Sequence, residues 1–378
     1  MRTLTVYILL FFVIAILSSC SSQDGGLEIV DLNDRSNGRV LELSELMENY
    51  RLVELETSER SLVPRYYQEF IGEKFILIIS DNEILQFNSE GRFIKSIGKK
   101  GKGPGEFSGI SDYVVNQDES KLYTYFNRKS DQLLGFDLNS GEELPTIHLP
   151  FKGIGDFILT KDYFLILGKR NSTVEMYTLS FDGELIEKLD ITGQARTVGY
   201  SGRGEYLKSV DENVYYLGID TDSVFQVEGV QKTVSIYFDV DNRYNYYKTI
   251  SGNLLSYSMQ CAKKSLLSLI DMKIEKIDGG TSSWVEGSES FLLDNQKGTI
   301  EYINGFYNNF FEMDVDNFPI SNNGNVVYLK YSALEYKDLL NRALENSSLD
   351  KDLAKKHKAL DANITEESNP IYLIGNAS

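Results

Sequence analysis

The sequence predicts an all-β protein built from repeated four-stranded antiparallel units, the pattern of a β-propeller. The stretch from Gly98 to Gly141 carries three short runs of alternating apolar and polar residues, separated by Asn, Asp, Ser or Lys. Such alternation between turn residues is typical of an antiparallel meander. The same order of parts recurs before and after this stretch, which indicates a radially repeated architecture.

The repeat has a consistent period. Turn glycines that follow a Phe-Asn or Phe-Asp start occur at Gly91, Gly141 and Gly183, which are 50 and then 42 residues apart. Four-stranded propeller blades span about 40 to 50 residues. We therefore expect one unit on each side of the stretch from Gly98 to Gly141. A fourth unit is expected over residues 205–238, and a fifth, with irregular turns and uncertain boundaries, after Asn242.

The two ends of the domain lack complete units of their own. Residues 28–56 contain the alternating runs EIVDL and RLVELET, and Pro370 to Gly375 reads as a last strand. Helical spacing of apolar residues predicts an insertion of two helices over about 332–360. Because a propeller hides its strand edges only when its ends are joined, we expect Pro370 to Gly375 to pair in one blade with residues drawn from 28–56.

The N-terminus predicts export and a lipid anchor. Residues 1–19 combine Arg2 with an uncharged run too short to span a bilayer, so they read as a signal peptide. Leu17-Ser18-Ser19-Cys20 resembles the lipobox of bacterial lipoproteins, which implies diacylglycerol on Cys20. Residues 20–27 form a polar tether to a single domain over 28–378. An ordinary signal peptide with a chance cysteine is the alternative.

Charge and residue usage exclude several classes of function. The formal net charge of −18 makes binding to nucleic acid or to anionic lipid headgroups unfavourable. Only Cys261 remains if Cys20 is lipidated, so no intramolecular disulfide is expected. His148, at a predicted strand end, and His357, on a predicted surface helix, are the only two histidines, too few for the usual zinc site.

The glycine-rich loop is expected to be structural. Gly101, Gly103, Pro104 and Gly105 lead into Glu106 and Phe107. A phosphate-binding loop would need G-x-x-x-x-G-K-[ST] before a helix, whereas a strand follows here and proline removes an amide donor. The sequence therefore predicts a crossover between blades, with Phe107 buried between them. The neighbouring Lys99, Lys100 and Lys102 form a small basic patch, read as a solvated loop, with an acidic ligand as the alternative.

Several stretches together resemble the six-bladed β-propeller lipoproteins of Bacteroidota, relatives of the NHL-repeat propellers. These stretches are RLVELET at 51–57, the run through GKGPGEF at 87–107, TDSVFQV at 221–227, and the helical segment before SNPIYLIG at 368–375. The resemblance implies six blades and attachment to the outer membrane, on an undetermined face. Members of this group are mostly of unknown function, so the resemblance implies architecture more than activity.

Three functions remain open. The first is a non-enzymatic binding or scaffold module for a protein partner or an oligosaccharide. The 24 tyrosines would suit stacking on sugar rings, although aromatic residues are also common in strands. The second is a metal-dependent hydrolase or lyase with its site in the central channel. The third is a structural accessory of an outer-membrane complex. No catalytic residue, metal site or cofactor is expected, and a Ca²⁺ ion in the channel has no supporting motif. We expect a monomer.

Overall fold

The computed structural model describes most of the chain beyond the predicted signal peptide and tether. The described residues are 28–101, 106–107, 109–125, 131–170, 173–190, 205–210, 213–218, 223–239, 252–261, 263–277, 280–345, 351–361 and 364–378. Cys20 and the predicted segments 1–19 and 20–27 lie outside them, as do Lys102, Gly103, Pro104 and Gly105.

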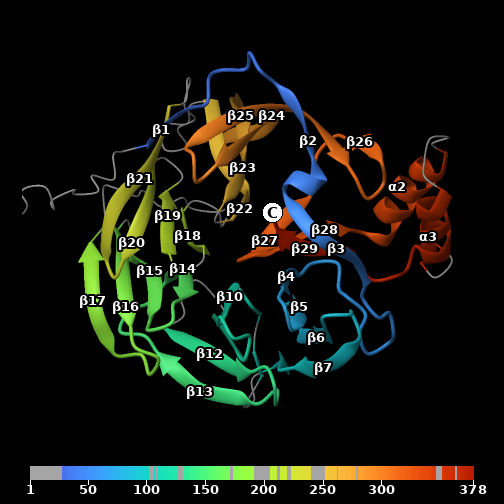
Figure 1. Ribbon diagram of the computed structural model, residues 1–378. Helices are drawn as coiled ribbons and strands as arrows, with labels where there is room; N and C mark the ends of the chain where they lie inside the picture. Colours follow the sequence, from blue (N-terminus) through green and yellow to red (C-terminus); the bar gives the residue numbers. More distant parts are fainter. Residues whose placement is uncertain are drawn as a thin grey trace, which may run out of the picture.

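The described strands form small antiparallel sheets arranged around a ring (Figure 1). In the sheets that follow chain order, the strand that comes first lies innermost, as β4 and β14 do. Three sheets follow chain order. The first blade contains β4 (Gln68–Ile71), β5 (Phe75–Ile79), β6 (Ile84–Asn88) and β7 (Phe93–Ile97), and the second contains β10 (Asp112–Val115), β11 (Lys121–Tyr125), β12 (Gln132–Asp137) and β13 (Glu143–His148). The third contains β14 (Ile154–Leu159), β15 (Phe164–Arg170), β16 (Thr173–Leu179) and β17 (Leu185–Asp190). The prediction of an all-β propeller of four-stranded antiparallel blades is confirmed.

Two larger sheets accept strands from the N-terminal segment. One contains β18 (Glu205–Val210), β19 (Asn213–Gly218), β20 (Ser223–Glu228) and β21 (Gln231–Asp239), with β1 (Glu28–Asp31) parallel to β21. The other contains β22 (Gly252–Gln260), β23 (Lys264–Ile277), β24 (Gly280–Asp294) and β25 (Thr299–Asn308), with β2 (Arg39–Glu42) parallel to β25 and β26 (Met313–Val315) beside it. The irregular unit expected after Asn242 is therefore a sheet with long strands.

The last sheet joins the two ends of the domain. It combines β27 (Ile320–Asn323), β28 (Val326–Tyr331) and β29 (Ile371–Ala377) with β3 (Met47–Glu54). Ile371 lies opposite Glu54 and Ala377 lies opposite Met47. The expected pairing of the C-terminal strand with residues from 28–56 is confirmed.

Apolar side chains pack between neighbouring sheets. One cluster contains Leu77 and Ile79 of β5 with Leu122 of β11 and Phe136 of β12. Alternate residues of a strand point to opposite faces, so each sheet contributes one face to each of its two neighbours. Comparable clusters lie at the junctions that follow around the ring. The core is thus a series of layers between blades.

The segment 28–45, which we name the strap, covers outer edges of the ring. It supplies β1 and β2 before the short 3₁₀ helix η1 (Leu43–Glu45). The outer edges of β7, β13 and β17 receive no added strand among the described residues. Each carries a register shift in its pairing and a lysine or proline, namely Lys95, Pro145 and Lys188. Such features discourage edge-to-edge aggregation.

Two helices, α2 (Ala333–Glu345) and α3 (Lys351–Asp361), follow β28 and precede β29 in the chain, and they pack outside the ring (Figure 1). Ser332 and Glu335 form reciprocal hydrogen bonds at the start of α2, a capping box. Tyr336, Leu340 and Ala343 are buried against the fifth and last sheets.

Candidate functional site

Lys330 and Glu69 form an ion pair across the junction between the last blade and the first. Lys330 Nζ lies 3.0 Å from Glu69 Oε2, and the side chains are 35% and 17% exposed. Lys330 Nζ also lies 4.2 Å from the centroid of the Tyr67 ring, within cation–π range. Among ion pairs of described residues, this one joins two different blades through their own strands.

The alternation of the strands explains why these two side chains meet. Val326 and Tyr328 of β28 belong to the apolar cluster that faces the first blade, and Lys330 is two residues further on the same face. Ile71 of β4 belongs to the same cluster, and Glu69 is two residues before it. The apolar layer therefore ends in a charged pair.

The pair lies toward one face of the ring, which we name the crossover face because chain crossovers between blades run along it. β28 starts after the tight turn at Gly324 and ends at Tyr331 beside Ile371, which in turn pairs with Glu54. Residues 55–67 then cross from β3 to β4. Lys330 and Glu69 are at the ends of their strands nearest to this crossover.

Tyrosines surround the pair. Tyr113 donates a hydrogen bond from its hydroxyl to the Glu69 carbonyl oxygen at 2.5 Å. The rings of Tyr328 and Tyr372 meet edge to face, 6.1 Å apart. What we name the seam cluster consists of these three tyrosines (Tyr113, Tyr328 and Tyr372) together with Tyr67, Glu69 and Lys330.

Burial controls the protonation of this cluster. It raises the pKa of the hydroxyls of Tyr113, Tyr328 and Tyr372 well above the ordinary value, so these groups stay neutral donors. Partial burial alone would lower the pKa of Lys330, but the adjacent Glu69 carboxylate outweighs it and the pKa is raised. The cluster thus presents a compensated ion pair among neutral hydroxyls.

The crossover loop beside the seam cluster exposes apolar groups. Tyr66 is 77% exposed and Leu62 is 61% exposed. Asn369, which is buried, holds this loop by accepting a hydrogen bond from the Val63 amide and donating to the carbonyls of Ser61 and Glu56. An exposed aromatic on a pinned loop is a feature of binding surfaces.

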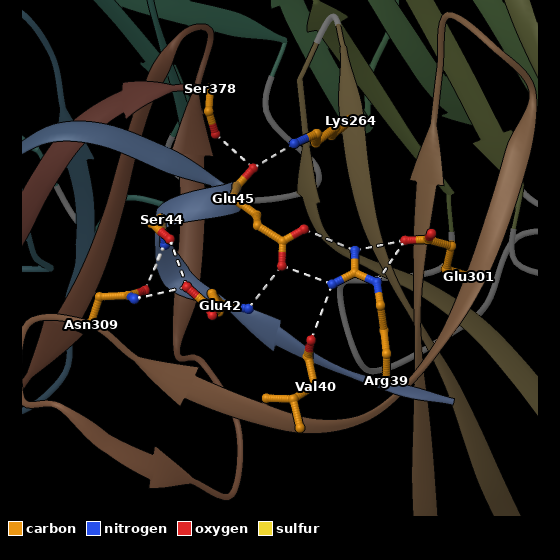
Figure 2. A network of polar contacts seen from close by, with 9 residues as sticks. All are labelled: Arg39, Val40, Glu42, Ser44, Glu45, Lys264, Glu301, Asn309 and Ser378. Carbon is orange, nitrogen blue, oxygen red and sulfur yellow. Dashed lines mark hydrogen bonds and ion pairs between the residues drawn. The ribbon is translucent and has the colours of Figure 1, made fainter. Parts of the chain in front are cut away.

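A second polar network, which we name the clasp, lies at the opposite end of the last blade (Figure 2). Arg39 binds the carboxylates of both Glu45 and Glu301, with N–O distances of 2.7 and 2.6 Å. Lys264 Nζ and Ser378 Oγ donate to the Glu45 carbonyl oxygen at 2.7 and 2.6 Å. Ser44, Glu42 and Asn309 extend the network. The clasp ties the strap, the fifth blade and the C-terminus together, which is a structural role.

The predicted inter-blade loop is described in part. Lys99 and Lys100 (β8) pair in parallel with Glu106 and Phe107 (β9), and the Gly101 amide donates to the Phe107 carbonyl oxygen at 2.9 Å. Phe107 is 1% exposed and packs in the cluster between the first two blades. Lys99 forms an ion pair with Glu106, with an N–O distance of 3.4 Å.

The histidines and the remaining cysteine do not form a site. His148 ends β13, as expected, and is exposed. His357 lies on α3, the helix expected at the surface, but its side chain is buried against Phe310 and Phe311. Cys261 is buried, with its Sγ 3.7 Å from the Gly324 carbonyl oxygen. Within the described ranges, no three His, Cys, Asp or Glu side chains are grouped so that they could hold a metal ion. Neither described helix has the length and apolar character needed to cross a membrane.

The seam cluster was not predicted from the sequence. Charged residues interrupt the apolar faces of two strands, YYQEFI and NVVYLKY, and that interruption is the one local signal. The pairing of the two charges depends on ring closure over a separation of 261 residues.

The fold and its sites define a β-propeller, and comparison with known proteins agrees. The family model described as "Domain of unknown function (DUF4934)" matches residues 27–376, so the chain belongs to this family. A Bacteroides fragilis protein described as a "Putative exported protein" shares the fold, with TM-score 0.64, 14% identity, and coverage of 93% of this chain and 100% of that one.

Two further solved structures match with lower TM-scores. A protein of unknown function from Bacteroides thetaiotaomicron matches with TM-score 0.42, 10% identity, and coverage of 86% and 76% of the two chains. The WD40 domain of Pan2 from Neurospora crassa matches with TM-score 0.39, 10% identity, and coverage of 70% and 74%. No curated protein matches the sequence.

Proposed function

We propose that this protein is a lipid-anchored propeller of the cell envelope that acts as a non-enzymatic binding module, with a protein or an oligosaccharide as its partner. The observation that carries the proposal is the seam cluster, in which residues of the first, second and last blades combine an ion pair with tyrosines beside an exposed loop. Binding sites commonly combine apolar or aromatic surface with a few fixed polar groups.

The proposal includes a ring of six NHL-like blades with Cys20 as the anchor. Six sheets of four or more strands among the described residues support the blade number. The structural similarity to the Bacteroides fragilis protein described as a "Putative exported protein" supports placement outside the cytoplasm. The lipobox-like sequence before Cys20 supports attachment to the outer membrane.

A scaffold role for a protein partner is supported by the exposed Leu62 and Tyr66 on the crossover loop. Aromatic residues are enriched at the anchors of protein interfaces. This alternative and the oligosaccharide alternative use the same face of the ring, so one set of variants tests both.

The test compares the mature wild-type protein with Tyr66→Ala and Phe181→Ala on a glycan array and in pull-downs from envelope extract. Both aromatic residues are exposed, at 77% and 46%, so neither change should unfold the domain. We expect binding to a glycan or a protein that is lost in Tyr66→Ala and kept in Phe181→Ala. Equal binding profiles for all three proteins would refute a site at the crossover loop.

A further inference from the structure

We infer that the seam cluster and the exposed Tyr66 form a site for an uncharged oligosaccharide. This inference rests on the proposed binding function and narrows its ligand to one chemical class. It follows from two properties of the site: the charges of Lys330 and Glu69 compensate each other, and Tyr66, the chain neighbour of Tyr67, is exposed.

The compensated charges argue against an ionic ligand. Lys330 is 3.0 Å from Glu69, so an anion would have to displace a carboxylate that is only 17% exposed. The formal net charge of −18 adds long-range repulsion of anions. A cation would meet the ammonium group of Lys330 at the same position. At the ion pair itself, net attraction therefore favours neither sign of charge.

The polar groups match sugar hydroxyls. A carboxylate accepts hydrogen bonds from hydroxyl groups, and an ammonium group donates them to hydroxyl oxygens. Glu69 and Lys330 supply one of each and both keep some exposure. Sugar rings also carry apolar C–H faces that pack on aromatic rings. Tyr66 is 77% exposed, and the Arg65 guanidinium lies over one face of its ring, 5.3 Å from the centroid, so a sugar would pack on the other face.

The experiment measures binding of maltohexaose, cellohexaose and mannohexaose to the mature protein by titration calorimetry, with hexagalacturonate as the anionic counterpart. We expect one neutral hexaose to bind, with an affinity that changes little between about 50 and 500 mM NaCl because no net charge is neutralised. Tyr66→Ala should weaken binding about tenfold, as loss of an aromatic anchor does. Tyr66→Phe should keep the affinity, and Phe181→Ala is the matched control.

Two outcomes would overturn the inference. Tighter, salt-sensitive binding of hexagalacturonate would show that the site selects anions, and no binding of any neutral hexaose at millimolar concentration would remove the sugar class. In both cases the proposed binding function is judged separately, by whether a partner on the array or in the extract depends on Tyr66. Lys330→Met with Glu69→Gln gives a second check, because the double variant keeps the site uncharged but removes its strongest donor and acceptor.

Discussion

Lys330 and Glu69 are 261 positions apart in the chain, yet their Nζ and Oε2 atoms are 3.0 Å apart because the last blade closes against the first. The pair ends an otherwise apolar layer between these blades. It therefore reports directly on ring closure as well as on the proposed binding site.

Removing one partner of this pair should destabilise the fold. Glu69→Gln leaves the half-buried ammonium of Lys330 without its counter-ion, and an uncompensated polar group of this kind costs about 1 to 3 kcal/mol. Urea unfolding should show the loss, and the double variant Glu69→Gln/Lys330→Met should recover part of it. Asp338→Asn, in an exposed helical pair with Arg342, should cost at most about 0.5 kcal/mol. Equal effects at both sites would contradict a role for the seam pair in closure.

The pH dependence of stability should depend on His357. Burial lowers the pKa of His357 below its ordinary value of 6.5. The unfolded chain then binds the proton first, so stability is full above the ordinary pKa and is lost as the pH falls through the lowered pKa of the folded state. Nε2 lies 3.0 Å from the Phe310 carbonyl oxygen, and Nδ1 is buried without a partner.

Thermal melts of wild type and His357→Gln between about pH 7.5 and 5 measure this effect. The wild type should lose more stability than the variant on acidification, because only the wild type has the His357 imidazole. The carboxylates titrate in both proteins, so their contribution is shared. Parallel pH profiles would show that His357 does not titrate over this range.

How far the sequence predicted the fold depends on how local each signal is. The alternating strands and the turn glycines at Gly91, Gly141 and Gly183 were predictable, since all three glycines adopt positive φ. The parallel pairing of β1 with β21 and of β2 with β25 was not predictable, because a strand added to a distant outer edge leaves no period in the sequence.

The burial of His357 could have been predicted. It follows Leu353 by four residues and precedes Leu360 by three, so it lies on the same face of α3 as these leucines. The seam cluster was beyond reach, because two charges in separate strands reveal a partnership only once the ring is closed. The three-way contact of Arg39 with Glu45 and Glu301 is hidden for the same reason.

Truncation of Phe107 should be costly. Its ring is 1% exposed between the first two blades, and an alanine there typically loses about 3 to 5 kcal/mol. Gly98, at a φ of 60°, lies against this ring and a Cβ atom there would be 2.8 Å from Phe107 Cε1, so Gly98→Ala should also destabilise. Urea unfolding measures both, with Phe181→Ala as a control expected to change stability by at most about 0.5 kcal/mol. An unchanged midpoint for Phe107→Ala would mean that the loop does not fix the second blade.

Cys20→Ala should move the protein from the membrane fraction to the soluble fraction of the envelope. The reason is that the lipid, and not the acidic surface, would hold the protein at the membrane. Cell fractionation with immunoblotting measures the change. Cys261→Ala is the matched control: Cys261 is a buried cysteine of the folded domain, so its replacement should leave the distribution unaltered. Finding the wild-type protein in the soluble fraction would show that it has no lipid anchor.

Deletion of residues 369–378 should open the ring. It removes β29, which pairs with β28 on one side and β3 on the other, and so leaves two strand edges unpaired. It also removes Asn369 from the crossover loop and the hydrogen bond of Ser378 in the clasp. The truncated protein should aggregate or lose its cooperative melt, as followed by circular dichroism and light scattering. Deletion of residues 21–26 from the tether is the control and should leave the melt unaltered. A truncated protein that melts like wild type would show that the ring remains stable without the strand shared by its two ends.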